Sequence, residues 1–239
     1  MPGIGTLINT AAIILGGLLG LGCGKFMKEH YQEALMKVCG LCVIFVGISG
    51  ALEKMFTITP DGITSGGSMM VIGSFSIGTL IGECINIEGK LVHFGEWLKI
   101  RTGNSREKRF VDGFVSASLT VCIGAMAIVG AIQDGIYGDY STLALKAVLD
   151  LIIIWVMTAS MGKGCIFSAI PVALLQGSVT FLASLFEPLM TPEALNNLSL
   201  TGAMLIFCVG INLIWERTFR VANMLPTIVI AVIWALAAA

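Results

Sequence analysis

Apolar and polar residues alternate along this chain in long blocks. Eight apolar segments of 16 to 23 residues are separated by short polar loops. A helix needs about 20 residues to cross the ~30 Å hydrocarbon core of a bilayer, and each block approaches or exceeds that length. The pattern therefore predicts an all-α polytopic membrane protein with eight transmembrane helices, at residues 4–24, 36–53, 67–87, 113–133, 142–161, 164–186, 200–215 and 221–239.

The positive charges gather in alternate loops. Only Lys54 and Lys146 fall on one side of the predicted membrane. The other side receives twelve basic residues: Lys25, Lys28, Lys37, Lys90, Lys99, Arg101, Arg106, Lys108, Arg109, Lys163, Arg217 and Arg220. Cytoplasmic loops retain Lys and Arg, so this asymmetry predicts that residues 88–112 are cytoplasmic and that both termini lie outside.

Composition supports one membrane domain over residues 1–239. The chain is 56% hydrophobic and 12% charged, whereas soluble domains carry about 25% charged residues. A net charge of -1 gives no reason to expect a nucleic-acid partner. The N-terminus lacks a basic region and a cleavage site, so residues 4–24 are predicted to be a retained span.

The longest polar stretch runs from Asn86 to Asp112 and begins with an amphipathic helix. Ile87, Leu91, Phe94, Trp97 and Leu98 share one side of it. Such a helix lies at the membrane surface, with tryptophan at headgroup level. The basic turn at 101–109 then serves either as a positive-inside anchor or as a binding site for anionic lipid or a cytoplasmic partner.

A weak internal repeat links the two ends of the chain. Residues 46–56 and 209–219 both contain Val-Gly-Ile followed by Glu-Lys/Arg-x-Phe at the same spacing. The two copies are five helices apart and would cross the membrane in opposite directions. Helices 1–3 and 6–8 are therefore predicted to form an inverted repeat, as in many secondary transporters, whose substrate site lies at the repeat interface.

Several ordered motifs are familiar as a set. They are GTLINTAAIILGGLLG at 5–20, CIGAMAIVGAIQDG at 122–135, DYSTLALKAVLD at 139–150, FSAIPVALLQG at 167–177 and VANMLP at 221–226. Together they resemble the bacterial YqgA-like membrane protein family, domain of unknown function 554, over nearly the whole chain. The resemblance implies a bacterial inner-membrane protein. It brings no established activity, so no catalytic residue is carried over from it.

Asp150 is the main candidate for a functional group inside the membrane. It lies about eight residues into its segment, near the midplane, with Lys146 one turn before it and Thr158 two turns after it on the same face. Ionisable residues in lipid face a bundle interior or a water-filled cavity. Two interpretations stay open: a structural ion pair with Lys146, or a carboxylate that couples protons or cations or binds substrate.

Other polar residues inside the spans are further candidates. Gln176 lies near mid-depth, and Pro171 one turn earlier is expected to kink the helix and free a carbonyl, as Pro226 would in the last helix. Asn9 interrupts a small-residue seam on the first helix and is expected either to bond a neighbouring helix or to bind a ligand.

Helix 3 carries a polar stripe, which is predicted to point into the bundle. Its members are Ser76, Thr79, Glu83 and Asn86. Glu83 is near the cytoplasmic end, where it would belong to the interface or to a gate. Asn212 completes the candidates, and Gln133-Asp134 is interpreted as a polar helix end at the outer surface.

Enzyme function has little support. The chain has no GxxxxGK[ST], HExxH or GxSxG motif and no histidine cluster, so no catalytic residue, metal site or cofactor is predicted. The Cys39–Cys42 pair is expected to pack in its helix.

The sequence favours a secondary transporter of a small polar or anionic metabolite, coupled to a cation or proton. The alternatives are a passive channel and a non-transporting scaffold or regulator. The glycine seams are compatible with a homodimer, or with packing inside one chain.

Overall fold

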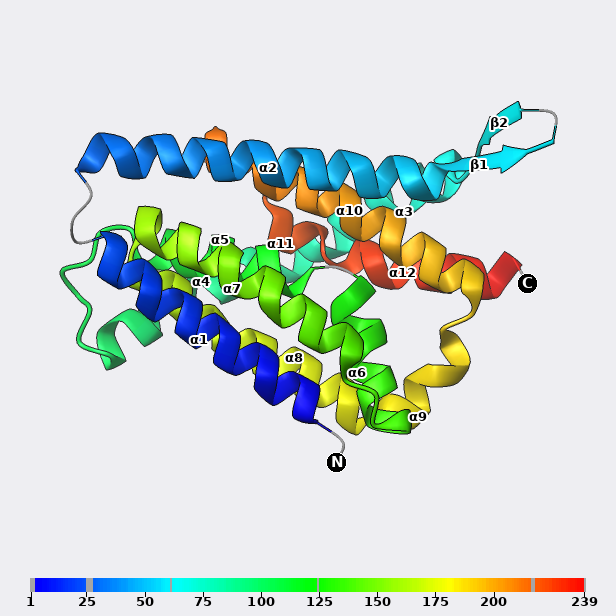
Figure 1. Ribbon diagram of the computed structural model, residues 1–239. Helices are drawn as coiled ribbons and strands as arrows, with labels where there is room; N and C mark the ends of the chain where they lie inside the picture. Colours follow the sequence, from blue (N-terminus) through cyan, green and yellow to red (C-terminus); the bar gives the residue numbers. More distant parts are fainter. Residues whose placement is uncertain (1–2, 25–27, 61, 124, 216–217, 239) are drawn as a thin grey trace.

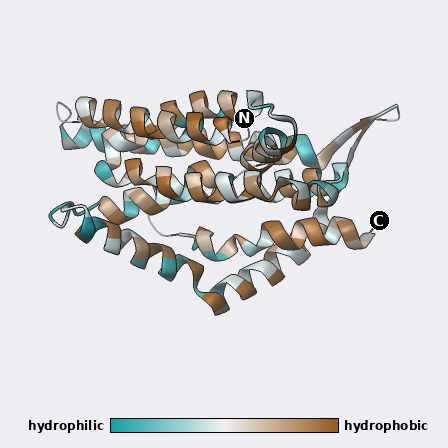
Figure 2. Cartoon of the chain, turned by 90° about the horizontal axis from the view of Figure 1, so that it is seen from below, coloured by the Kyte–Doolittle hydropathy of each residue, from teal (hydrophilic) through white to brown (hydrophobic). Residues whose placement is uncertain are grey.

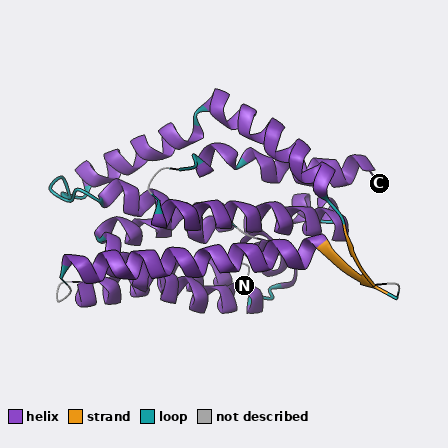
Figure 3. Ribbon diagram, turned by 90° about the horizontal axis from the view of Figure 1, so that it is seen from above, coloured by secondary structure: helices purple, strands orange, loops and turns teal. Residues whose placement is uncertain are grey.

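The chain folds into an elongated helical bundle with one short hairpin (Figures 1 and 3). The computed structural model describes residues 3–24, 28–60, 62–123, 125–215 and 218–238. Lys25 of the charge count, and Glu216 and Arg217 of the repeat motif, lie outside the described residues. The prediction of an all-α membrane protein is confirmed.

The elements follow one another along the chain with short connections. The first half contains α1 (Ile4–Gly24), α2 (Glu29–Met55), the antiparallel strands β1 (Phe56–Thr59) and β2 (Gly62–Ser65), α3 (Ser68–Ile85), α4 (Ile87–Arg101), α5 (Phe110–Cys122) and α6 (Ala125–Tyr137). The second half contains α7 (Ser141–Met161), the 3-10 helix η1 (Lys163–Ser168), α8 (Ala169–Phe181), α9 (Ala183–Phe186), η2 (Glu187–Leu189), α10 (Pro192–Ile214), α11 (Val221–Met224) and α12 (Pro226–Ala238).

Among the residues that the structure describes, six helices are long and apolar enough to cross a membrane by length and composition. Three predicted spans differ from single helices. Residues 113–133 divide between α5 and α6, which meet at 60°, residues 164–186 divide among η1, α8 and α9, and residues 221–239 divide between α11 and α12. The bent α5–α6 pair brings the number of spans to seven, so the count of eight stays a prediction.

Close helix packing depends on glycine. The seam on α1 lies against α7, where a Cβ at Gly16 or Gly20 would overlap the main-chain oxygens of Leu151 and Trp155. Gly47 of α2 approaches the backbone of α10 in the same way. Lipid offers helices little hydrophobic reason to associate, so contact between backbones supplies the attraction. These seams pack inside one chain and therefore give no support for a homodimer.

The main helix pairs are α1 with α7, α2 with α10, and α3 with α11 and α12. The pair α2–α10 joins predicted helices 2 and 7, and the pair of α3 with α11 and α12 joins predicted helices 3 and 8. The proposed inverted repeat of helices 1–3 and 6–8 would relate the two members of each of these pairs. Superposition of the two triplets remains a prediction.

The outside of the bundle is apolar. On α1, Leu7, Leu15 and Leu18 are exposed on the side away from the glycine seam. Figure 2 shows hydrophobic residues along the middle of the helices and hydrophilic ones mainly toward their ends. This distribution suits a bilayer as surroundings, because apolar side chains are solvated by lipid at no cost.

The predicted amphipathic helix is present as α4. Leu98 is buried, and it clusters with Phe110 and Phe114 of α5 and with Leu91 and Phe94 of α4 itself. Trp97 is 55% exposed, as expected for a residue at headgroup level. The apolar face of α4 therefore holds it against α5.

Both prolines lie next to a point where a predicted span passes from one helix to the next, and a kink at either of them stays a prediction. Pro171 lies in the first turn of α8, directly after η1, and Pro226 is the first residue of α12. The first turn of a helix leaves its N–H groups without intrahelical partners, so proline is tolerated there without loss of a hydrogen bond.

We expect Gly16→Ala to lower the free energy of unfolding by about 1–3 kcal/mol, because the new methyl group overlaps the Leu151 carbonyl and separates α1 from α7. Gly22→Ala on the same helix is the matched control, since nothing lies within 4 Å of a Cβ there. Unfolding in detergent or nanodiscs measures both. Equal stability of the two variants would contradict the packing.

A buried polar site at the end of helix α5

Two buried ionisable groups lie together on α7. Lys146 donates a hydrogen bond to the Asp150 carboxylate, and their side chains are 8% and 5% exposed. The spacing of four residues places both on one helix face. The pairing predicted from sequence is therefore present, and Lys146, which the charge count assigned to a loop, is buried.

The Lys146 ammonium has a second partner that the sequence did not reveal. Its Nζ donates to the main-chain oxygen of Val121 at 2.8 Å. Val121 lies in the last turn of α5, where the chain turns by 60° into α6 and the final carbonyls lose their intrahelical partners. A cation at a helix C-terminus also interacts favourably with the helix dipole.

Two amides from other helices complete the site. Asn9 of α1 donates from Nδ2 to Oε1 of Gln176 on α8 at 3.3 Å, and its amide also interacts with the Asp150 carboxylate. Asn9 is 0% exposed and Gln176 is 1% exposed. Asn9, Gln176, Lys146, Asp150 and the Val121 carbonyl are named below the polar site.

The polar site has hydrogen-bonding capacity to spare. Asn9 Oδ1 and Gln176 Nε2 have no hydrogen-bond partner among the described residues. A buried polar atom without a partner costs about 1–3 kcal/mol, so a core selected only for stability would avoid leaving one acceptor and one donor there. The site can therefore accept a water molecule or a small polar solute.

The remaining sequence candidates do not join this site. The buried face of α3 consists of Met70, Ser74, Gly78 and Gly82, so the prediction that the stripe of Ser76, Thr79, Glu83 and Asn86 points inward was wrong. Ser76 is exposed and Thr79 is partly buried. Gly78 and Gly82 determine which face of α3 is buried, because at these two glycines α3 touches the backbone of Thr227 and Asn223.

Glu83 and Asn212 have structural partners instead. Glu83 forms an ion pair with Arg220, whose guanidinium also donates to Asn86 Oδ1 at 2.8 Å. Asn212 donates to the Phe219 carbonyl at 2.6 Å and accepts from its N–H at 2.8 Å. Both residues thus hold together the connection that leads into α11.

Asp134 was interpreted as a surface helix end, and the structure corrects this. It is 0% exposed, and its Oδ2 accepts from the N–H groups of Gly3 and Gly5 at 3.1 and 2.9 Å. A carboxylate at these positions caps α1 and neutralises the positive end of its dipole.

In the loop before α7, hydrogen bonds from the hydroxyl and N–H of Ser141 lower the pKa of Asp139.

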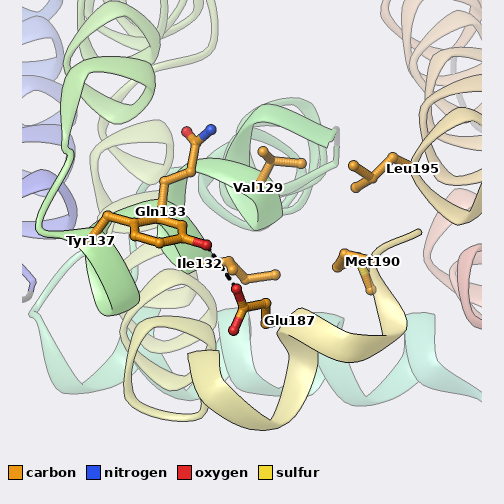
Figure 4. A pocket seen from close by; sticks show the side chains of 7 residues that line it. All are labelled: Val129, Ile132, Gln133, Tyr137, Glu187, Met190 and Leu195. Carbon is orange, nitrogen blue, oxygen red and sulfur yellow. Dashed lines mark hydrogen bonds between the residues drawn. The ribbon is translucent and has the colours of Figure 1, made fainter. Parts of the chain in front are cut away.

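Two cavities lie away from the polar site. The smaller, of about 250 Å³, is lined by Val129, Ile132, Gln133, Tyr137, Glu187, Met190 and Leu195 (Figure 4). The Tyr137 hydroxyl donates to Glu187 across it at 2.8 Å. The larger, of about 940 Å³, opens among α2, α4, α5, α7 and α10. No group of three or more His, Cys, Asp or Glu in the described ranges could hold a metal ion.

Comparison with known proteins places the chain in a family. The profile of the family described as "Protein of unknown function (DUF554)" matches residues 4–236. The chain belongs to this family. It is 30% identical over 229 residues to "Uncharacterized membrane protein YdfK" of Bacillus subtilis, covering 95% of this chain and 93% of the relative.

A second relative of the family is "Uncharacterized protein YqgA" of Escherichia coli, which is 27% identical over 232 residues. The match covers 95% of this chain and 94% of that protein. No solved structure matches the chain. The family resemblance inferred from the sequence motifs is confirmed, and the chain is a membrane protein of that family.

Asp150→Asn is expected to lower the free energy of unfolding by about 3–5 kcal/mol, because it leaves the Lys146 ammonium buried without its counter-charge. Lys146→Met together with Asp150→Asn should restore most of the loss, as seen in melting temperature.

The matched control is the exposed Glu33–Lys37 pair of α2, which has the same spacing of four residues. Glu33→Gln with Lys37→Met should change the melting temperature little, because exposed pairs are hydrated and screened. A single Asp150→Asn variant as stable as this control would refute the buried ion pair.

Proposed function

We propose that this membrane protein is a secondary transporter of a small polar or anionic metabolite, coupled to a proton or cation. The observation that carries the proposal is the polar site: a buried ion pair, two amides with unpartnered atoms and the carbonyl of an interrupted helix, from α1, α5, α7 and α8. Interrupted helices whose ends line a mid-membrane site are the usual construction of secondary transporters.

Depth supports the same proposal. Asp150 lies nine residues after Ser141 and eleven before Met161, hence ~14 and ~17 Å from the two ends of α7. A carboxylate there persists only if it is paired, hydrated or protonated. Asp150 and Lys146 are the groups we assign to coupling, and Asn9 and Gln176 are those we assign to solute binding.

A scaffold without transport is the second candidate, and the Lys146–Asp150 pair itself favours it. In that case the pair only joins α7 to α5. The two functions differ in what they predict for a stable variant that lacks the Lys146–Asp150 pair: a transporter would lose uptake, and a scaffold would have no uptake to lose.

We propose that the protein lies in a bacterial inner membrane with α4 on the cytoplasmic side and both termini outside. The basic residues of the loops support this orientation. We expect Asn104→Cys, in the loop after α4, to be labelled by a membrane-impermeant maleimide in inside-out vesicles but not in intact cells. Labelling of this cysteine in intact cells would show that the protein has the opposite orientation.

The test of transport uses purified protein in proteoliposomes with an imposed pH gradient. A panel of radiolabelled short carboxylates and amino acids is offered, and uptake is measured. We expect at least one solute to be concentrated by the wild-type protein and by the Glu33→Gln/Lys37→Met control.

The stable Lys146→Met/Asp150→Asn variant should lose this uptake by at least about tenfold, since a barrier increase of 1.4 kcal/mol is tenfold in rate. A solute that enters the proteoliposomes only until its concentrations inside and outside are equal indicates a channel. Absence of uptake for the whole panel, with the two variants behaving alike, would contradict the transporter.

A further inference from the structure

The larger cavity reaches from the basic loop end of the bundle into its interior. Its wall includes Lys108 and Arg109 before α5, Arg220 before α11, and Glu88 and His93 on α4. Buried apolar residues also line it: Leu119, Met161 and Leu213. At about 940 Å³ it has room for a metabolite, because ligand sites typically enclose about 300–1,000 Å³.

The charges along this wall are unevenly matched. Glu88 and Asp112 line the cavity, and each takes part in an interaction of its own. Arg220 is paired with Glu83, and His93 with Glu96. The side chains of Lys108 and Arg109 are exposed and form no ion pair or side-chain hydrogen bond within the part of the chain that the structure describes, although the charge of Arg109 is felt by Glu33 on α2. Two adjacent cations without a close ion-pair partner therefore line the cavity, on a wall that also carries Glu88 and Asp112.

A helix end adds to this positive potential. Arg109 is the residue that precedes α5, and Asp112 lies in the first turn of that helix. The N-terminus of a helix carries partial positive charge and free N–H groups, which favour anions. N–H groups are already taken at the start of both helices: at α4 Asn223 accepts from Glu88 and Asn86 accepts from Gly89, and at α5 Glu107 accepts from Phe110. The start of α5 is the part of the wall best suited to an anion because two cations, Lys108 and Arg109, stand directly before it.

An apolar layer separates this cavity from the polar site. On α7, Ile154 and Met157 lie between Asp150 and Met161. Ile154, Met157 and Met161 belong to one buried apolar cluster. Leu213 of α10 and Val121 of α5 are part of the same cluster. Along α7, Met161 of the cavity wall is eleven residues, or ~17 Å, from Asp150, whereas on α5 the wall residue Leu119 is only two residues before Val121. The cavity thus ends at an apolar barrier, and the polar site lies beyond it.

We propose that this cavity binds a small soluble anion bearing a carboxylate or phosphate group, held by Lys108 and Arg109. Its further role as the cytoplasmic entrance to the polar site rests on the proposed transport function, whereas binding itself does not. Arginine and lysine are the residues that recognise carboxylate and phosphate, by a planar fork and a point charge respectively. The same chemistry would suit a lipid headgroup, and the experiment separates the two sources.

The experiment titrates succinate and inorganic phosphate into the full-length protein in nanodiscs of neutral phosphatidylcholine, with binding measured by calorimetry. We expect saturable binding of one of these probes that weakens as salt is added. Lys108→Gln/Arg109→Gln should weaken it about tenfold or more, since two charge-assisted contacts are lost. Lys90→Gln/Arg101→Gln removes the same charge from α4, outside the cavity wall, and should change affinity less than twofold.

Three results would overturn the proposal. The first is absence of binding by either probe in neutral nanodiscs. The second is an equal loss of affinity in both double variants, which would mean diffuse surface attraction only. The third is retention of phosphatidylglycerol that depends on Lys108 and Arg109 and excludes both probes, which would assign the cavity to lipid. Binding without uptake in proteoliposomes would refute transport and leave the anion site standing, and uptake without binding would do the reverse.

Discussion

One ammonium group in the middle of an apolar bundle constrains much of this structure. A buried charge is stable only when it is paired and hydrogen bonded. Lys146 meets this requirement through Asp150 on its own helix and through the carbonyl of Val121, which is open because α5 ends there. The bend between α5 and α6 and the charge on α7 thus support each other: the bend frees an acceptor, and the lysine occupies it.

The glycine seam of α1 serves the same site. Gly16 and Gly20 bring the α1 backbone against α7, and this approach carries Asn9 to Asp150 and to Gln176 of α8. The cap from Asp134 fixes the beginning of α1 one turn before Asn9. Segments remote in sequence therefore meet at this site: α1 and α5 reach the ion pair itself, and α8 reaches it through Asn9.

Much of this arrangement could be predicted from the sequence, because it depends on local spacing. Four residues between Lys146 and Asp150 place them on one helix face, and polar residues inside apolar blocks are expected to face inward. Ser76 escaped this rule because the glycines of α3 lie on the opposite face and draw that face into the bundle. The Val121 carbonyl has no signature in the sequence, since any residue provides it. The prolines mark points that the sequence could indicate, since Pro171 and Pro226 lie at the start of α8 and of α12, where two predicted spans change helix.

Under the proposed function, the polar site must become reachable from water in some state of the protein, whereas a purely structural ion pair stays sealed. The most direct measurement replaces Gln176 by cysteine, in a background without the native cysteines, and follows its reaction with a charged methanethiosulfonate reagent in membranes. Leu174→Cys on the same helix is the control, since Leu174 is 66% exposed toward the predicted lipid surface. The account predicts that the cysteine at 176 reacts and that the one at 174 does not. A cysteine at 176 as unreactive as that at 174 would contradict it.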